Sequence, residues 1–264
     1  MVDSHTTRTV LITGASAGIG KAFAHVFAKN GFDVVLVARR QDKLEALAGE
    51  LKKTYGQLAW ALPADLGDPA APQLIFDWCQ QQQIQVDALV NNAGYGLNCE
   101  FLEADWDTHR AFMQVMMNSV VHLCHLFSPA MQANGYGRII NLASIAAWAP
   151  QLKGNLYNAA KAFVLDFSQA LDLELKPHGV HCTALCPGFT FSEFHDVMGN
   201  RGSVSKLPKF LWMSADDVAQ EGFDAVMEGK AVHINGLVNQ GVSQVMAMLP
   251  PRVKEFLSKQ QKLM

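Results

Sequence analysis

A run near the start of the chain reads Thr9-Val10-Leu11-Ile12-Thr13-Gly14-Ala15-Ser16-Ala17-Gly18-Ile19-Gly20. Its first five residues are apolar or β-branched, which favours a buried strand. The glycines that follow allow a tight turn, and a helical pattern starts at residue 21. A strand, a glycine-rich turn and a helix in this order predict a βα unit whose helix N-terminus offers free N–H groups to a phosphate.

Similar apolar runs recur along the chain and alternate with segments of helical periodicity. The apolar runs lie at 9–13, 33–38, 58–62, 87–91, 138–143, 180–185 and 231–235, and the helical segments at 21–30, 41–53, 69–83, 106–133 and 157–176. This alternation predicts an α/β fold with a doubly wound parallel sheet of the Rossmann type, with about seven strands and helices on both faces. We find no linker and expect residues 1–264 to form one domain.

Composition excludes several classes of function. The 264 residues are 50% hydrophobic and carry a net charge of −3, so no basic field would attract nucleic acid. No apolar stretch approaches the ~20 residues that span a bilayer. The five cysteines lack Cys-x-x-Cys spacing, and the polar N-terminus lacks a signal-peptide pattern. We therefore expect a cytoplasmic protein with reduced thiols, no membrane span and no metal site.

The glycine turn and the end of the second strand predict the cofactor. Gly14, Ser16, Gly18, Ile19 and Gly20 would lie along a pyrophosphate. The second strand ends Val37-Ala38-Arg39-Arg40, without the acidic residue that holds the ribose of NAD. A guanidinium binds a 2′-phosphate well, so we predict NADP(H), with Arg39 as the better candidate and Arg40 as a second one. The alternative is that both arginines are simply solvated.

Two further turns follow strands of the predicted sheet. Asp65, with Leu66 beside it, follows the third strand and could accept a hydrogen bond from an adenine amino group or serve only as a turn residue. The fourth strand ends at Asn91, and Asn92-Ala93-Gly94 follow it. The small residues of this turn would permit close approach to a bound nucleotide, and asparagine side chains can fix neighbouring backbone.

Tyr157 and Lys161 are four positions apart in a predicted helix, so their side chains share one face. A phenol loses its proton near pH ~10, which is too high for exchange with a substrate at neutral pH. A neighbouring cation favours the phenolate and would lower the pKa of the tyrosine. The pair could act as a proton donor and acceptor, and the alternative is an ordinary solvated helix face.

Taken in order, these motifs resemble the short-chain dehydrogenase/reductase family. The resemblance rests on Thr13 to Gly20, Asp65, Asn91 to Gly94, Asn118, Ser144, Tyr157-x-x-x-Lys161 and Pro187-Gly188. It covers roughly residues 7 to 238 and is specific because seven weak motifs occur in one order. The Arg39-Arg40 pair resembles the NADPH-preferring, single-domain members of that family.

The resemblance implies a role for each catalytic candidate. Tyr157 would protonate a carbonyl oxygen or deprotonate an alcohol, and Lys161 would lower its pKa and bind the nicotinamide ribose. Ser144 would hydrogen-bond the substrate oxygen. Asn118 would hold a water that links Lys161 to solvent.

The resemblance also implies where the substrate binds. Pro187, Gly188 and Thr190 would embrace the nicotinamide, and residues 189–213 would form a flap over the substrate. The apolar residues suited to line the pocket are Tyr95, Leu97, Trp148, Leu152, Phe189, Phe191, Phe194, Met198, Phe210, Leu211, Trp212 and Met213. The amphipathic, Met-rich tail 240–264 could cover the pocket, extend an interface or touch a membrane surface.

The sequence therefore predicts an NADPH-dependent oxidoreductase that interconverts an apolar ketone or aldehyde and its alcohol, and that assembles as a homodimer or homotetramer. One alternative is an NAD-linked alcohol dehydrogenase, which Arg39 disfavours. A second is a non-catalytic nucleotide-sensing protein, which would not need the Ser144–Tyr157 pair.

Overall fold

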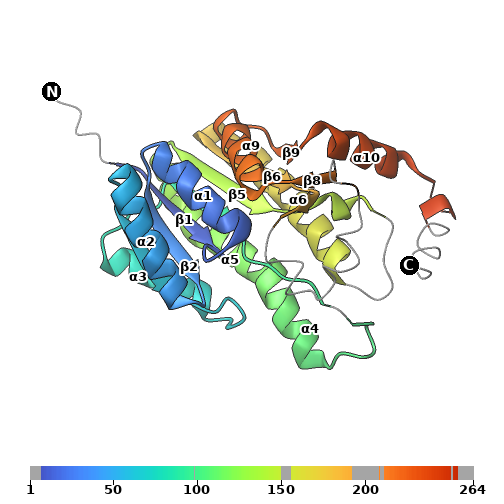
Figure 1. Cartoon of the computed structure of the whole chain (residues 1–264), viewed down its shortest axis with the longest axis horizontal. Helices are drawn as coiled ribbons and strands as arrows, with labels where there is room; N and C mark the ends of the chain where they lie inside the picture. Colours follow the sequence, from blue (N-terminus) through green and yellow to red (C-terminus); the bar gives the residue numbers. More distant parts are fainter. Residues whose placement is uncertain are drawn as a thin grey trace.

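Seven parallel strands form one sheet through the middle of the protein (Figure 1). The strands are β1 (Thr9–Thr13), β2 (Asp33–Ala38), β3 (Ala59–Pro63), β4 (Ala88–Asn91), β5 (Gly137–Leu142), β6 (Val180–Cys186) and β9 (Val232–Ile234). The computed structural model describes residues 7–97, 99–149, 156–191, 208, 211–250 and 252–254. The order β3-β2-β1-β4-β5-β6-β9 reverses its direction of growth between β1 and β4. Ligands of such sheets bind beyond the carboxyl ends of the strands at this point.

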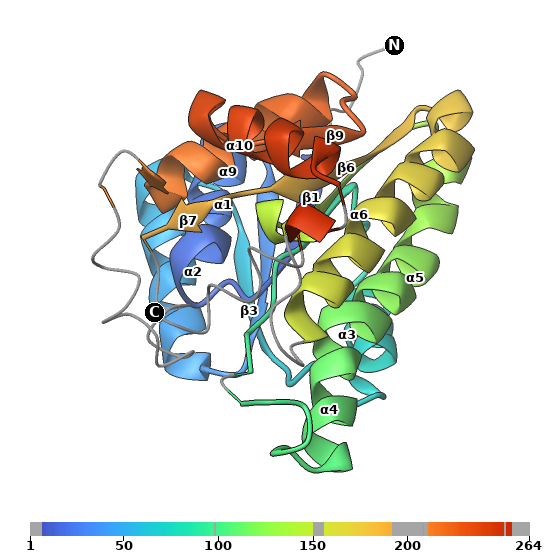
Figure 2. The same ribbon diagram turned by 90° about the vertical axis from the view of Figure 1, so that its right-hand side faces the viewer.

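Helices cover both faces of the sheet, as Figure 2 shows. One layer contains α1 (Gly18–Lys29), α2 (Gln41–Tyr55) and α9 (Ala215–Met227), and the other contains α3 (Ala71–Gln81), α5 (Ser119–Ala133) and α6 (Leu156–Leu175). Successive side chains of a strand point to opposite faces, so Val10 and Ile12 pack in the first layer and Leu11 in the second. The predicted doubly wound α/β fold is confirmed.

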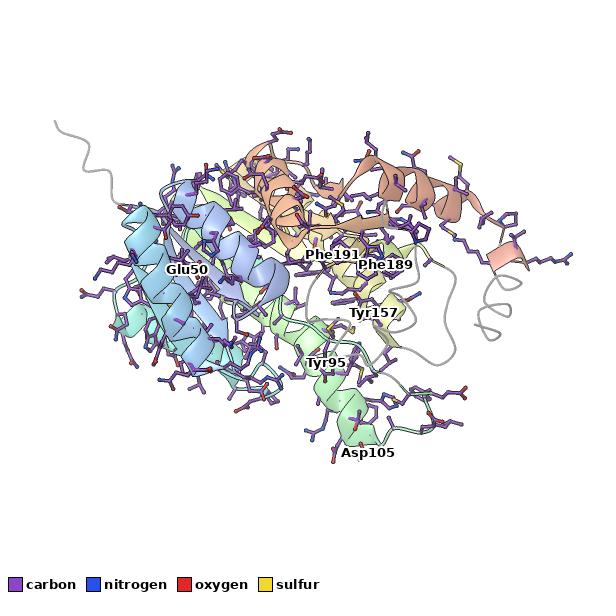
Figure 3. The ribbon with its side chains drawn as sticks, in the orientation of Figure 1. Glu50, Tyr95, Asp105, Tyr157, Phe189 and Phe191 are labelled. Atoms are coloured by element: carbon purple, nitrogen blue, oxygen red, sulfur yellow. The ribbon has the colours of Figure 1, made fainter. Side chains whose placement is uncertain are left out.

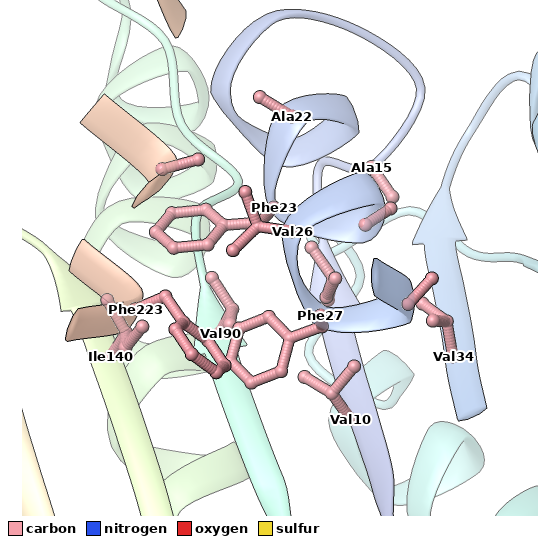
Figure 4. Close-up of a cluster of buried hydrophobic side chains, with 14 of the residues drawn as sticks. Val10, Ala15, Ala22, Phe23, Val26, Phe27, Val34, Val90, Ile140 and Phe223 are labelled. Carbon is pink, nitrogen blue, oxygen red and sulfur yellow. The ribbon is translucent and has the colours of Figure 1, made fainter. Parts of the chain in front are cut away.

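Aromatic rings hold α1 against the sheet (Figure 4). Phe27 of α1 meets Phe223 of α9 edge to face, with ring centroids 5.0 Å apart, and Phe23 is fully buried beside it. Burial of one such ring contributes about 1.5–3 kcal/mol. These contacts fix the position of α1 and therefore of the glycine turn at its N-terminus.

The long helix predicted at 106–133 is interrupted. It consists of α4 (Trp106–Met113), a π-helical turn η1 (Gln114–Asn118) and α5. A π-turn places one extra residue in the helix and changes which side chains face the core, and such turns often occur at functional sites. Hydrophobic periodicity does not reveal so local a change.

Two C-terminal helices, α9 and α10 (Leu237–Met248), have no counterpart among the predicted segments. On α10, the buried positions hold Asn239 and Ser243, whereas Val245 and Met248 are exposed. Because polar residues occupy the buried face of α10, its sequence lacks the apolar side chains at helical spacing from which a helix is predicted. None of the helices in the described ranges is long and apolar enough to cross a membrane.

A short parallel ladder joins the two ends of the predicted flap. β7 (Phe189–Thr190) pairs with β8 (Trp212–Met213), so that Phe189 lies opposite Trp212. Four of the predicted pocket residues, Leu152, Phe194, Met198 and Phe210, lie outside the described residues, as do 255–264 of the predicted tail. The flap and the role of the tail remain predictions.

Candidate active site

The turn after β4 is tied to the end of β1. The Asn92 side-chain amide donates hydrogen bonds to the carbonyls of Thr13 (2.9 Å) and Gly14 (3.3 Å). In return, the Thr13 hydroxyl oxygen accepts hydrogen bonds from the backbone N–H groups of Asn92 (2.9 Å) and Ala93 (3.0 Å). The predicted residues Asn92, Ala93 and Gly94 are thus held beside the glycine turn.

Two glycines of this turn cannot carry a side chain. Gly14 has a φ of +65°, and a Cβ there would lie 2.7 Å from the Asn92 amide nitrogen. A Cβ on Gly20 would lie 2.3 Å from the Gly14 carbonyl oxygen. Helix α1 begins at Gly18 behind Ala17, which supplies no side-chain cap, and its first turn has no acidic residue. The N–H groups of its first turn are therefore suited to a phosphate, and the pyrophosphate role of these residues stays a prediction.

The two arginines after β2 are exposed and differ in their contacts. Arg40 donates hydrogen bonds to the Ser16 hydroxyl from Nη2 (2.9 Å) and Nε (3.2 Å), which ties it to the glycine turn. Arg39 lies close enough to Tyr95 to lower its pKa, although burial raises that pKa more strongly. The sequence favoured Arg39, and the contact between Arg40 and Ser16 was not foreseen.

Asp65 and Leu66 lie beyond the end of β3. The Asp65 carboxylate accepts a hydrogen bond from the Gly67 N–H at 2.9 Å, which is the turn role weighed above. The Leu66 carbonyl accepts a hydrogen bond from the Ser119 hydroxyl at 3.1 Å. Asp65 itself stays exposed, so its carboxylate is still accessible to a ligand.

Ser144, Tyr157 and Lys161 meet beyond the end of β5. Ser144 accepts a hydrogen bond from the Ala146 N–H (3.1 Å) as the N-cap of a short helix, η2 (Ile145–Ala147), and it is hydrogen-bonded to Tyr157. Lys161, one turn further along α6, lies with Nζ 5.6 Å from the Tyr157 ring centroid. It donates a hydrogen bond to the Leu142 carbonyl at 2.6 Å. Figure 3 shows Tyr157 on the side of the molecule that also carries Tyr95 and Phe189.

The proton chemistry of this group differs from the expectation. Burial raises the pKa of Tyr157 to about 12, and the hydrogen bond with Ser144 acts in the opposite direction. Burial lowers the pKa of Lys161 to about 8. The expected lowering of the tyrosine pKa by the lysine is wrong for the protein alone, because desolvation of the phenol dominates and the ammonium is directed at the Leu142 carbonyl. The phenol is thus protonated at neutral pH and ready to donate.

Asn118 does not join this group. Its side chain is exposed, and its amide donates a hydrogen bond to Gln114 Oε1 at 3.2 Å. Met116, two residues earlier, is 1% exposed and packs in the apolar cluster that includes Tyr157. Positions two apart lie about 200° apart around a helix, which is why these side chains face opposite ways.

The turn after β6 closes the site. The Pro187 carbonyl accepts a hydrogen bond from Ser144 Oγ at 3.4 Å, and the Thr190 hydroxyl donates to the Gly188 carbonyl at 3.1 Å. A Cβ on Gly188 would lie 2.4 Å from Oδ1 of Asn239, a buried residue of α10. Sequence reasoning missed Asn239, because a lone uncharged amide in the C-terminal region carries no motif.

Aromatic side chains gather beside this turn. Trp212 stacks on Phe191 with ring centroids 4.8 Å apart and lies 5.5 Å from the ring of Phe189. Leu97 and Tyr95 lie with Tyr157 in a separate apolar cluster. Apolar side chains thus gather in two groups, one after the turn that follows β6 and one around Tyr157.

Comparison with known proteins decides the family. The sequence model of the short chain dehydrogenase family matches residues 8–200. The chain belongs to the short-chain dehydrogenase/reductase family.

Curated and solved members of the family match most of the chain. Serine 3-dehydrogenase of Agrobacterium fabrum is 33% identical, covering 90% of this chain and 96% of that protein. The NADP-dependent 3-hydroxy acid dehydrogenase YdfG of Escherichia coli is 31% identical, covering 91% and 97%. A short-chain dehydrogenase from Sphingobium yanoikuyae, solved in complex with NADPH, is 31% identical with a TM-score of 0.80, covering 92% and 96%. The predicted family and enzyme class are confirmed.

Proposed function

We propose that this short-chain dehydrogenase/reductase interconverts a ketone or aldehyde and the corresponding alcohol, with Tyr157 as the acid and base. The observation that carries the proposal is the hydrogen bond between Ser144 and Tyr157 beside the buried Lys161, at the sheet edge that also holds the glycine turn. The enzyme is NADP-dependent, in agreement with the prediction of NADP(H), and this cofactor supplies or accepts the hydride.

The chain's own residues would handle the proton and the oxygen. During reduction, the carbonyl carbon gains the hydride, and the Tyr157 hydroxyl gives its proton to the carbonyl oxygen. Ser144 stabilises the negative charge that develops on that oxygen. Lys161, with a pKa of about 8, can return a proton to the tyrosine from the buried side. Oxidation follows the same steps in reverse.

The remaining candidates would hold the cofactor. The glycine turn and the N-terminus of α1 suit the pyrophosphate, and Arg39 with Arg40 suits the 2′-phosphate. Asp65 would hold the adenine end. Pro187, Gly188 and Thr190 would contact the nicotinamide end.

The substrate proposed here is apolar, and the support for it is the aromatic surface formed by Phe189, Phe191 and Trp212. A second candidate is a 3-hydroxy acid. One relative that covers 91% of this chain is named an NADP-dependent 3-hydroxy acid dehydrogenase, and another that covers 90% is named a serine 3-dehydrogenase. A carboxylate would need a basic group in the pocket, so the two candidates differ in the substrate charge that the site accepts.

A substrate panel separates these possibilities. Initial rates are measured through nicotinamide absorbance, with NADPH and NADH for an aryl ketone and a 3-oxo acid ester, and with NADP+ and NAD+ for oxidation of the free 3-hydroxy acid. We expect turnover of the ketone and the ester with NADPH. Activity confined to the free acid would replace the apolar substrate by the second candidate.

A single substitution tests the mechanism. Tyr157→Phe should lower kcat by about 10³-fold, because loss of a general acid typically costs 10²–10⁴-fold. The dissociation constant for NADPH should change only a few-fold, which serves as the control for folding. Turnover at the wild-type rate would contradict the proposed function.

We also propose a cytoplasmic homodimer or homotetramer. Large apolar side chains are exposed on α6, where Leu173 is 77% accessible, and at the start of α4, where Trp106 is 65% accessible. Such surface favours association. Light scattering after gel filtration should give two or four times the 28.9 kDa chain mass.

A further inference from the structure

The helical wall beside Tyr157 centres on a methionine. Met116 is 1% exposed, and its sulfur lies 3.4 Å from the backbone nitrogen of Tyr95, which donates a weak hydrogen bond to it. The same sulfur would lie 3.0 Å from a Cβ on Gly94. The thioether is therefore in tight contact with the turn after β4.

Met116 also belongs to the apolar cluster around the catalytic tyrosine. The buried members are Phe112, Met116 and Ala160, and the partly buried ones are Tyr95, Leu97, Met113, Met117, Leu156 and Tyr157. Phe112 and Met116 are four residues apart and share a helix face, whereas Asn118 points to solvent. The helix thus presents an apolar wall, and not an amide, to Tyr157.

We propose that Met116 is the residue of this helical turn that positions Tyr157, by filling the space between α6 and the turn after β4 and keeping water from that side of the phenol. The inference rests on the proposed function, since it assigns Met116 a part in the same proton transfer. Met116 contacts the turn after β4, which lies beside the glycine turn, and it belongs to the apolar cluster around Tyr157. One side chain therefore connects the proposed cofactor site with the proposed acid.

The chemistry of a thioether suits this position. Methionine is flexible and polarisable and fills irregular gaps, and its sulfur accepts only weak hydrogen bonds. A side-chain amide of equal length would bring polar atoms and water to the same place. Water near the phenol would stabilise the phenolate and lower the pKa of Tyr157.

Polar groups from two elements lie beside Tyr157. They are Lys161 from α6 and the Ser144 hydroxyl from the turn after β5, and the Tyr95 side chain belongs to the same apolar cluster as Tyr157. A change in the acidity of Tyr157 on substitution of Met116 would therefore report on water admitted through this wall.

Matched variants test the proposal through the pH dependence of carbonyl reduction with NADPH. Met116→Gln keeps the length of the side chain and adds an amide, and Met116→Leu keeps an apolar one. We expect the alkaline limb of kcat for Met116→Gln to move to lower pH by at least one unit, with kcat at pH 7 reduced about tenfold. Met116→Leu should keep the wild-type limb and a kcat within about threefold. Asn118→Ala should stay within twofold of wild type.

The proposal is overturned if Met116→Gln keeps the wild-type pH profile, or if Asn118→Ala loses tenfold or more. Should the amide variant fail to fold, Met116→Ala must lower kcat tenfold while Asn118→Ala does not, and equal rates for these two would also overturn it. Tyr157→Phe distinguishes the two failures: an active Tyr157→Phe would contradict the proposed function, whereas an inactive Tyr157→Phe with a wild-type pH profile for Met116→Gln would contradict only the role of Met116.

Discussion

The cofactor end and the acid end of the site are built in different ways. The glycine turn is held by hydrogen bonds between two neighbouring strand ends, in which the side chains of Thr13 and Asn92 reach backbone groups of the other strand end. The acid end combines side chains from the turns after β4 and β5 and from α6, and it contains the buried Lys161 and the partly buried Tyr157. The geometry of the cofactor end requires residues without side chains, whereas the pKa values at the acid end are set by the exclusion of water.

Among the variants that test the difference between the two ends, the largest effect is expected for a substitution at the cofactor end. Gly20→Ala replaces a helical glycine, which alone would favour the helix by about 1 kcal/mol. The new Cβ would lie 2.3 Å from the Gly14 carbonyl, so the turn must shift, and overpacking of this kind typically costs about 1–3 kcal/mol. We expect the NADPH dissociation constant to rise more than tenfold, measured by fluorescence titration, with a lower melting temperature.

Gly49→Ala is the matched control for this comparison. Gly49 also lies in a helix, α2, but nothing lies within 4 Å of a Cβ there. We expect a higher melting temperature and unchanged NADPH affinity. Equal behaviour of the two alanine variants would show that close backbone approach does not define the cofactor end.

The next effect probes dehydration at the acid end. The pKa of Lys161 falls from 10.5 to about 8 in the folded protein, so below pH 8 the fold carries a buried ammonium. Between pH 8 and 10.5 the unfolded chain binds more protons than the folded one, and stability rises with pH. Each pKa unit corresponds to about 1.4 kcal/mol.

Lys161→Met should therefore be more stable than wild type at pH 7, by on the order of 2 kcal/mol once the lost hydrogen bond to Leu142 is included. The difference should shrink as the pH rises from 8 to 9.5. Denaturant unfolding of both proteins at pH 7, 8 and 9.5 measures it. A difference in the free energy of unfolding that stays constant with pH would contradict the lowered pKa of Lys161.

The smallest effect concerns the recognition of the 2′-phosphate. We expect Arg39→Ala to raise the NADPH dissociation constant about tenfold while that for NADH stays the same, because a charge-assisted hydrogen bond contributes about 1.5–3 kcal/mol. Arg40→Ala should have a weaker effect, through loss of its hydrogen bonds to Ser16. The reverse ranking would assign the phosphate to Arg40, and equal affinities of wild type for NADPH and NADH would dismiss both.

Much of this architecture could be predicted from local pattern. The strands at 9–13 and 33–38 have the bounds that the sequence indicated, because fully buried strands appear as continuous apolar runs. Tyr157 and Lys161 were predicted from their four-residue spacing and Ser144 from the resemblance to the family, and the structure brings the three side chains together. The role predicted for Asn118 stays a prediction; the structure adds that its side chain is exposed on the π-turn, which changes the phase of the helix within a few residues.

The sequence by itself determined the parallel sheet and the glycine turn, because these follow from residue size and hydrophobic period, and its seven short motifs carried the resemblance to the family. Only the tertiary structure decided the proton chemistry of Tyr157, the inward position of Met116 and the contact of Asn239 with Gly188. The physical reason is that desolvation and packing depend on neighbours brought together from distant parts of the chain, and no local pattern records them.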